Sequence, residues 1–120
     1  MNKITLYGIS NCNTVKAART WLAENRIDYV FHDFKKAGLD ETRVEQWLEQ
    51  IEWPSLLNRS GTTWRKLAEA RKAAINSAQA AKILMCEQPS IVRRPVLEYE
   101  AKLLVGFDPQ RYQAFFQSPQ

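Results

Sequence analysis

Cys12 is the residue of this chain that is best placed to do chemistry. The residue pattern predicts a short strand over 3–8, a turn over 9–12 and an amphipathic helix over 13–25. A thiol at such a strand-to-helix turn faces the free amide groups and the positive dipole end of the helix, which stabilise a thiolate. Cysteines in these positions have a pKa well below the ordinary value. We therefore predict that Cys12 is a nucleophile.

The alternative for Cys12 is a packing role, because free cysteines are among the most buried residue types. Its neighbours Asn11, Asn13 and Thr14 are turn and cap formers, which favours the reactive interpretation. Asn11 either orients the turn or donates a hydrogen bond to a bound anion, and the residues alone leave both roles open.

The second cysteine, Cys86, follows the apolar residues 83–85 near the end of a predicted helix and is expected to be a core thiol. A transient disulfide between Cys12 and Cys86 is the alternative. Two cysteines do not make a disulfide framework, and the single histidine, His32, leaves no plausible Cys/His zinc site. No metal is therefore predicted, and His32 is expected to be a structural residue of a strand.

Basic side chains are concentrated in one stretch of a chain whose net charge is +4. Residues 59–94 contain eight basic and two acidic side chains, of which the lysines are expected on solvated helix faces. Arg59, Arg93 and Arg94 fall in predicted loops, where arginine is suited to binding an anion. Arg93 points away from Arg94 if the segment is extended, and a salt bridge to the acidic residues of 98–100 is the alternative for Arg94. Direct nucleic-acid recognition is not expected, since no reading motif is present.

The length and composition are typical of one soluble globular domain: 120 residues, 45% of them apolar and 25% charged. No apolar run approaches the roughly 20 residues needed to span a bilayer. Residues 1–5 lead into the first strand without a signal peptide, so a cytoplasmic location without membrane contact is expected. Residues 117–120 are expected to form a frayed tail.

The remaining elements are predicted from capping residues and apolar periodicity. A second strand is predicted over 28–34, and helices are predicted to begin at Asp40, at Thr62 or Thr63, and at Ser77. Their apolar positions are Val44, Trp47, Leu48 and Ile51, then Trp64, Leu67 and Ala68, then Ala81, Leu84 and Met85.

Prolines mark two helix ends and one helix start. The pair 53–54 is expected to end the first of these helices, and Pro89 closes the last one. Residues 107–109 supply a staple residue, an N-cap and a proline at the first helical position of a closing helix. Tyr112 then falls where it can contact Phe107.

The order β-α-β, three helices, β-β-α predicts an α/β fold. Residues 1–35 and 89–117 are expected to form a four-stranded mixed sheet with its helices, in which the first two strands are parallel. The last two strands, over 96–98 and 102–106, are expected to form a hairpin. Residues 36–88 are then an inserted helical lobe within a single domain.

Three motifs are spaced along the chain: YGISNC at 7–12, LNRSGTTW at 57–64 and IVRRPVL at 91–97. Together with the order of elements, they resemble the bacterial arsenate reductase (ArsC)/Spx family, and within it the ArsC-related group known as YffB. The resemblance covers essentially the whole chain. It implies a thioredoxin-like fold with a helical insertion.

The resemblance also implies roles for individual residues. Cys12 aligns with the nucleophilic cysteine of the arsenate reductases and with the first cysteine of Spx. Arg94 aligns with an arginine that binds the oxyanion in the reductases. Pro95 aligns with the cis-proline that faces the cysteine in thioredoxin-like folds.

Three positions depart from the family pattern. Val15 stands where Spx proteins often carry the second cysteine of a Cys-x-x-Cys switch, so that internal disulfide cannot form. Asn58 and Gly106 stand where the reductases have further arginines, although Arg59 is adjacent to the first. A site optimised for arsenate is therefore not expected.

The function expected from these residues is a thiol-dependent oxidoreductase, specifically a glutathione-dependent thiol reductase with Cys12 as its single nucleophile. No tightly bound cofactor is expected; glutathione would be the co-substrate, or a glutaredoxin-like partner would recycle the enzyme. The expected thiol-substrate and anion site consists of Asn11, Arg59, Arg93, Arg94 and Pro95. The alternatives are an Spx-like regulator, which binds the RNA polymerase α-subunit without catalysis through the basic stretch 59–94, and an arsenate reductase.

Overall fold

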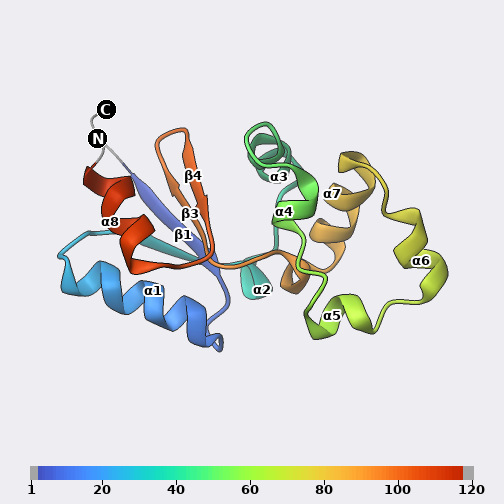
Figure 1. Ribbon diagram of the computed structural model, residues 1–120, viewed down its shortest axis with the longest axis horizontal. Helices are drawn as coiled ribbons and strands as arrows, with labels where there is room; N and C mark the ends of the chain where they lie inside the picture. Colours follow the sequence, from blue (N-terminus) through green and yellow to red (C-terminus); the bar gives the residue numbers. More distant parts are fainter. Residues whose placement is uncertain (1–2, 118–120) are drawn as a thin grey trace. The chain divides into compact units, whose positions relative to one another are not determined.

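The computed structural model describes residues 3–117 and divides into two compact units (Figure 1). The first unit contains the chain up to Asp33 together with the chain from Arg94 onward, and the second is Phe34–Arg93. The helical lobe predicted over residues 36–88 is similar in extent to the second unit, which begins two residues before and ends five residues after those limits. The domain organisation itself stays a prediction. Of the expected tail, Gln117 is helical, and residues 118–120 lie outside the described part of the chain.

The first unit is a four-stranded mixed sheet with two helices. Its elements are β1 (Ile4–Gly8), α1 (Asn13–Glu24), β2 (Val30–Asp33), β3 (Val96–Tyr99), β4 (Lys102–Val105) and α8 (Pro109–Gln117). The strand order is β2-β1-β3-β4, in which β1 and β2 are parallel and the other two pairs are antiparallel. The predicted α/β fold, the parallel first pair and the final hairpin are therefore confirmed.

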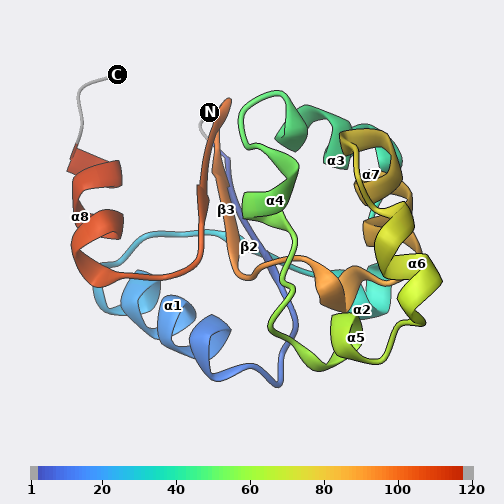
Figure 2. The ribbon, with the colours of Figure 1, turned by 45° about the vertical axis from the view of Figure 1, so that its right-hand side comes forward.

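The core of the first unit lies between one face of the sheet and the two helices. The register places Leu6 of β1 opposite Phe31 of β2 and Leu97 of β3, at the centre of that face. The fully buried side chains of the core are Leu6, Ala18, Leu22, Leu97 and Tyr112. Figure 2 shows α1 and α8 on the same side of the sheet. Each fully buried leucine contributes roughly 1.5–3 kcal/mol relative to an exposed one, so this core fixes α1 on the sheet.

The start of α8 follows the predicted capping signal. Asp108 Oδ1 accepts a hydrogen bond of 2.9 Å from the Gln110 amide, and Pro109 occupies the first helical position. The rings of Phe107 and Tyr112 meet edge to face with centroids 4.8 Å apart. The staple, the N-cap and the proline at N1 are thus confirmed, and they direct α8 onto the sheet.

Tyr112 offers a test of the packing in this core. Its side chain is fully buried, and its hydroxyl has no hydrogen-bond partner among residues 3–117. An unsatisfied buried polar group costs about 1–3 kcal/mol, so we expect Tyr112→Phe to raise the free energy of unfolding by about 1 kcal/mol. Urea denaturation measures this change. Tyr29→Phe is the control, because the Tyr29 hydroxyl accepts a 2.9 Å hydrogen bond from Arg19 Nε and its loss should not stabilise the protein. A destabilised Tyr112→Phe variant would contradict the prediction.

The second unit is built from short helices. These are α2 (Phe34–Ala37), α3 (Glu41–Leu48), α4 (Trp53–Leu56), α5 (Thr62–Arg65), α6 (Glu69–Ala74), α7 (Ala78–Glu87) and the 3₁₀ helix η1 (Pro89–Ile91). Asp40 caps α3 by accepting from the Thr42 amide, and Ser77 caps α7 by accepting from the Ala80 amide, as predicted. Leu84 and Met85 of α7 are fully buried, also as predicted.

The prediction of three helices in this segment was wrong in two places. Pro54 does not only end a helix: it stands in the first turn of α4, where its missing amide hydrogen costs nothing. The helix expected to bury Trp64, Leu67 and Ala68 is two helices, because Ala68 is extended and precedes α6. Neither α5 nor α6 has a buried residue, so neither has the apolar face that would stabilise a longer helix.

Two strand predictions also need correction at their ends. Phe34 does not belong to β2 but begins α2, where it is fully buried within the second unit. Ile91 lies in η1 rather than in an extended segment, and Val92 after it forms an isolated antiparallel bridge with Leu57. The apolar pattern of both segments reports burial, which a short helix satisfies as well as a strand does.

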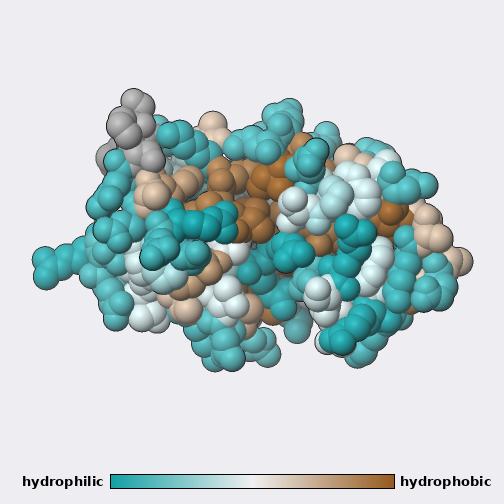
Figure 3. All heavy atoms as spheres, viewed as in Figure 1, coloured by the Kyte–Doolittle hydropathy of each residue, from teal (hydrophilic) through white to brown (hydrophobic). Residues whose placement is uncertain are grey.

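Large apolar side chains are mostly withdrawn from the surface. Among residues 3–117 the strongly exposed ones are Val30 and Ile83, and much of the face drawn in Figure 3 is hydrophilic. In the part of the chain that the structure describes, every helix is too short or too polar to cross a membrane.

Candidate active site at the start of α1

Cys12 is the N-cap residue of α1, at the turn that follows β1. Its backbone is extended, with φ −130° and ψ 123°, and its carbonyl accepts the first hydrogen bond of the helix, 2.9 Å from the Lys16 amide. The side chain makes no capping hydrogen bond and is half-buried. The sulfur therefore remains partly accessible beside the free amide groups of the first helical turn.

The surroundings of Cys12 favour its thiolate. Burial alone raises the pKa of the thiol. The nearby Val15 amide, a hydrogen bond from the Arg94 side chain and the nearby Thr14 amide act in the opposite direction, and the positive charge of Arg94 adds to them. Together they outweigh burial, so the pKa of Cys12 is lowered from its ordinary value. This is the electrostatic setting that the position of Cys12 in the sequence predicted.

Strand pairing brings Arg94 to this thiol from a distant part of the sequence. Tyr7 near the end of β1 pairs with Val96 at the start of antiparallel β3, so the residues before β3 lie beside those that follow β1. The Arg94–Pro95 peptide bond is cis, as the resemblance implied. The Pro95 carbonyl accepts a 2.8 Å hydrogen bond from the amide of Gly106, which ties the start of β3 to the end of β4.

The other predicted site residues occupy different places. Asn11 is exposed in the turn before Cys12. Arg59 and Arg93 are exposed and belong to the second unit. There the guanidinium carbon of Arg59 lies 5.8 Å from the ring centroid of Trp53, and the Arg93 amide donates to the carbonyl of Leu56 at 2.8 Å. The structure thus joins Arg94 to Cys12, and the roles of Asn11, Arg59 and Arg93 stay predictions.

Cys86 differs from Cys12 in its electrostatics. It is half-buried near the end of α7. Burial raises its pKa, and the carboxylates of Glu41 and Asp40 raise it further against the opposing charge of Lys82. The pKa of Cys86 is therefore raised while that of Cys12 is lowered, so the two thiols are not equivalent nucleophiles.

Lys82 was missed by the sequence reasoning, which expected the lysines on solvated faces. Its side chain is buried, and its Nζ lies 3.2 Å from Glu45 and 3.6 Å from Glu41 on the facing helix α3. Burial lowers the pKa of Lys82, but the two carboxylates more than offset this, so the pKa is raised and the side chain stays charged. The signal in the sequence was the pair of acids four residues apart on one helix, although nothing local paired them with a lysine 37 residues away.

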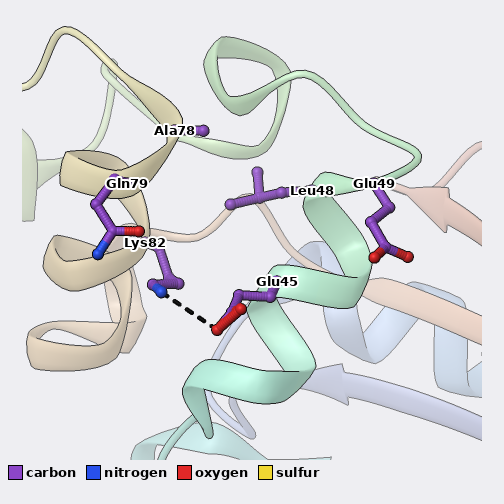
Figure 4. A pocket seen from close by; sticks show the side chains of 6 residues that line it. All are labelled: Glu45, Leu48, Glu49, Ala78, Gln79 and Lys82. Carbon is purple, nitrogen blue, oxygen red and sulfur yellow. Dashed lines mark hydrogen bonds and ion pairs between the residues drawn. The ribbon is translucent and has the colours of Figure 1, made fainter.

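The ion pair borders a pocket of the second unit (Figure 4). The pocket has a volume of about 250 Å³. It is lined by Glu45, Leu48, Glu49, Ala78, Gln79 and Lys82. Lys82 and Glu45, which line the pocket, are paired with each other. None of the lining residues is a cysteine or serine nucleophile. Among residues 3–117 no three or more His, Cys, Asp or Glu side chains are placed to hold a metal ion.

The sheet order, the cis-proline before β3 and the cysteine at the start of α1 define the class of protein. They are the features of a thioredoxin-like fold, in which a helix after the first strand presents its cysteine beside the residue that precedes the proline. The first unit of this chain is therefore a thioredoxin-like α/β structure, and the second is its helical insertion.

The family model that matches the chain is the ArsC family, over residues 7–115, and the chain belongs to this family. A solved YffB protein is 47% identical, with a TM-score of 0.89 over 93% of this chain and 97% of the other. An arsenate reductase (ArsC) related protein from Brucella melitensis is 50% identical, with a TM-score of 0.74 over 97% and 96%. The global transcriptional regulator Spx 2 of Lactococcus lactis subsp. lactis is 30% identical over 93% of this chain and 85% of its own length.

Proposed function

We propose that the protein is a glutathione-dependent thiol reductase that acts through one nucleophilic cysteine, Cys12. The observation that supports the proposal best is the contact between Cys12 and Arg94, together with the two backbone amides that lower the pKa of the thiol. A thiolate whose pKa lies near the ambient pH is the best compromise between ionised fraction and nucleophilicity. The proposed reaction belongs to the cytosol, where glutathione is kept reduced.

The proposed reaction consists of two thiol–disulfide exchanges. The Cys12 thiolate attacks the glutathione sulfur of a mixed disulfide between glutathione and a second thiol. The S–S bond of the substrate breaks, the second thiol leaves as a thiolate and takes a proton from solvent, and Cys12 becomes disulfide-bonded to glutathione. The thiolate of a second glutathione then attacks the glutathione sulfur held by Cys12, which releases oxidised glutathione and restores the Cys12 thiolate. The second thiol is thus released in reduced form, one free glutathione is consumed, and it leaves joined to the glutathione of the substrate as oxidised glutathione.

The residue at position 15 accounts for the use of an external thiol. Val15 has no sulfur, so the mixed disulfide on Cys12 has no resolving cysteine three residues along the helix. Free glutathione, or a glutaredoxin-like partner, would therefore release the enzyme, and no tightly bound cofactor is required. We assign to Arg94, with Asn11, Arg59, Arg93 and Pro95, the binding of the carboxylates and backbone of glutathione.

The test is turnover of a glutathione mixed disulfide with reduced glutathione as the electron donor. We expect Cys12→Ser to reduce the rate to the uncatalysed level, because the nucleophile is lost, and Cys86→Ser to keep most of it. Coupled measurement of oxidised glutathione gives both rates. Equal turnover by Cys12→Ser and the unmodified protein, or no turnover by either, would overturn the proposal. Arsenate in place of the disulfide tests the arsenate reductase alternative, which lacks cations at Asn58 and Gly106.

A second candidate function is supported by the similarity to Spx regulators over most of the chain. An Spx-like role would consist of binding the RNA polymerase α-subunit without catalysis, through the basic stretch 59–94. Val15 removes a Cys-x-x-Cys redox switch from such binding but not the binding itself. Capture of purified α-subunit by the immobilised protein, together with absence of glutathione turnover, would favour this function over the reductase.

A further inference from the structure

Gly8, the last residue of β1, lies against the first turn of α1. A Cβ atom added at Gly8 would be 2.8 Å from Val15 Cγ2 and 3.2 Å from Val15 Cγ1. Val15 is fully buried, and as a β-branched residue it has little rotameric freedom within a helix. An alanine at position 8 would therefore force Val15, and with it the first helical turn, away from the end of β1.

Val15 also contributes directly to the environment of the nucleophile. Its backbone amide belongs to the first helical turn beside the Cys12 thiol, as does the amide of Thr14, and both lower the pKa of that thiol. The side chain that meets Gly8 and the amide that meets Cys12 belong to one residue, so a shift of one moves the other. The contact between Gly8 and Val15 thus controls the distance from the amides to the sulfur.

We infer that Gly8 and Val15 are positioning residues for Cys12: the absence of a side chain at Gly8 lets the first turn of α1 lie close against β1, which holds the Thr14 and Val15 amides at the sulfur. The inference deepens the proposed function and rests on it, because it concerns the reactivity of the same cysteine. It also gives Val15 a second role, besides removing a resolving thiol from the helix.

The test is a cycle of variants in a Cys86→Ser background: Gly8→Ala, Val15→Ala and the double variant. The pH dependence of Cys12 alkylation by iodoacetamide is measured for each, with urea denaturation beside it. We expect Gly8→Ala to move the alkylation midpoint to higher pH and to reduce the thiolate fraction at neutral pH several-fold, since full loss of one charge-assisted hydrogen bond corresponds to about tenfold or more.

The double variant shows whether Gly8→Ala acts through its steric contact with the Val15 side chain or through another effect of the alanine at position 8. Val15→Ala removes both Cγ atoms and leaves Val15 Cβ, which is 3.6 Å from the added Cβ and therefore in ordinary contact. The midpoint of the double variant should coincide with that of Val15→Ala alone. If Gly8→Ala does not fold, recovery of folding in the double variant supports the steric pair, and no recovery contradicts it.

Two results would overturn the inference. One is a midpoint of Gly8→Ala equal to that of the parent, even with lowered stability, since a merely structural contact would change stability alone. The other is a double variant shifted as far as Gly8→Ala. Failure of the proposed function is a different result: no glutathione turnover by the parent protein, while its alkylation midpoint is low and responds to Gly8→Ala as described.

Discussion

Arg94→Ala is expected to raise the pKa of Cys12 and to reduce its thiolate fraction at neutral pH by about tenfold or more. The variant removes both a side-chain hydrogen bond to the sulfur and the nearby positive charge. A hydrogen bond to a charged group is worth about 1.5–3 kcal/mol, and 1.36 kcal/mol corresponds to one pKa unit. Burial, which opposes ionisation of Cys12, stays in place and is then less well compensated. The measurement is the pH profile of Cys12 alkylation in a Cys86→Ser background.

The pH range of the effect follows from the direction of the shift. Because the pKa of Cys12 is lowered in the folded protein, the parent and Arg94→Ala differ most between that lowered pKa and the higher pKa of the variant, and their profiles converge above the latter. Thiolate formation stabilises the folded state at pH values above the unfolded pKa, and this contribution is lost as the pH falls through the folded pKa. Arg94→Lys is the control, since it keeps the charge but not the planar guanidinium. Superimposable profiles for Arg94→Ala and the parent would contradict the prediction.

Trp47→Ala is expected to lower the free energy of unfolding by about 3–5 kcal/mol. Trp47 lies on α3 and is the largest of the fully buried side chains among residues 3–117. Its removal loses the transfer free energy of the indole and leaves a cavity that short helices can only partly close. Urea denaturation followed by circular dichroism measures the change.

The control for Trp47→Ala is Gln46→Ala, at the neighbouring position of the same helix. Gln46 is exposed, and its side chain accepts one long hydrogen bond of 3.4 Å from Arg43. A surface substitution of this kind changes stability by no more than about 0.5 kcal/mol. If the two variants were equally stable, Trp47 would not be the packing centre of the helical unit.

The parts of the fold that could be predicted from the sequence are those with local signals. The start of α8 needs only Phe107, Asp108 and Pro109, which are adjacent, and the structure has all three in their predicted roles. The position of Cys12 at the start of α1 could likewise be predicted from two adjacent elements, the first strand and the helix that follows it. The helices α5 and α6 were predicted as one because apolar spacing does not report how little of that surface the fold buries.

The contacts that could not be predicted are those between distant residues. Arg94 is 82 positions from Cys12, and no local signal in the sequence relates the two: the resemblance to the ArsC family implies that they are neighbours, and the pairing of β1 with β3 brings them together. Lys82 meets Glu45 from 37 positions away, so its burial had no local sign. The role of Gly8 is even harder to predict from the sequence, because it depends on the absence of a side chain that would collide with Val15.

The pKa values of Cys12 and Cys86 are shifted in opposite directions, so the unmodified protein can be labelled selectively at one of its two cysteines. Thiol reagents react with the thiolate form of a cysteine. At mildly acidic pH they should therefore label Cys12, whose pKa is lowered, and leave Cys86, whose pKa is raised, unlabelled. Because Val15 carries no thiol, a molecule that forms a disulfide with Cys12 stays bound until an external thiol such as glutathione attacks that disulfide. Cell extracts from which small thiols have been removed can therefore be searched for disulfide partners of Cys12 with the native chain as bait, without an engineered trap.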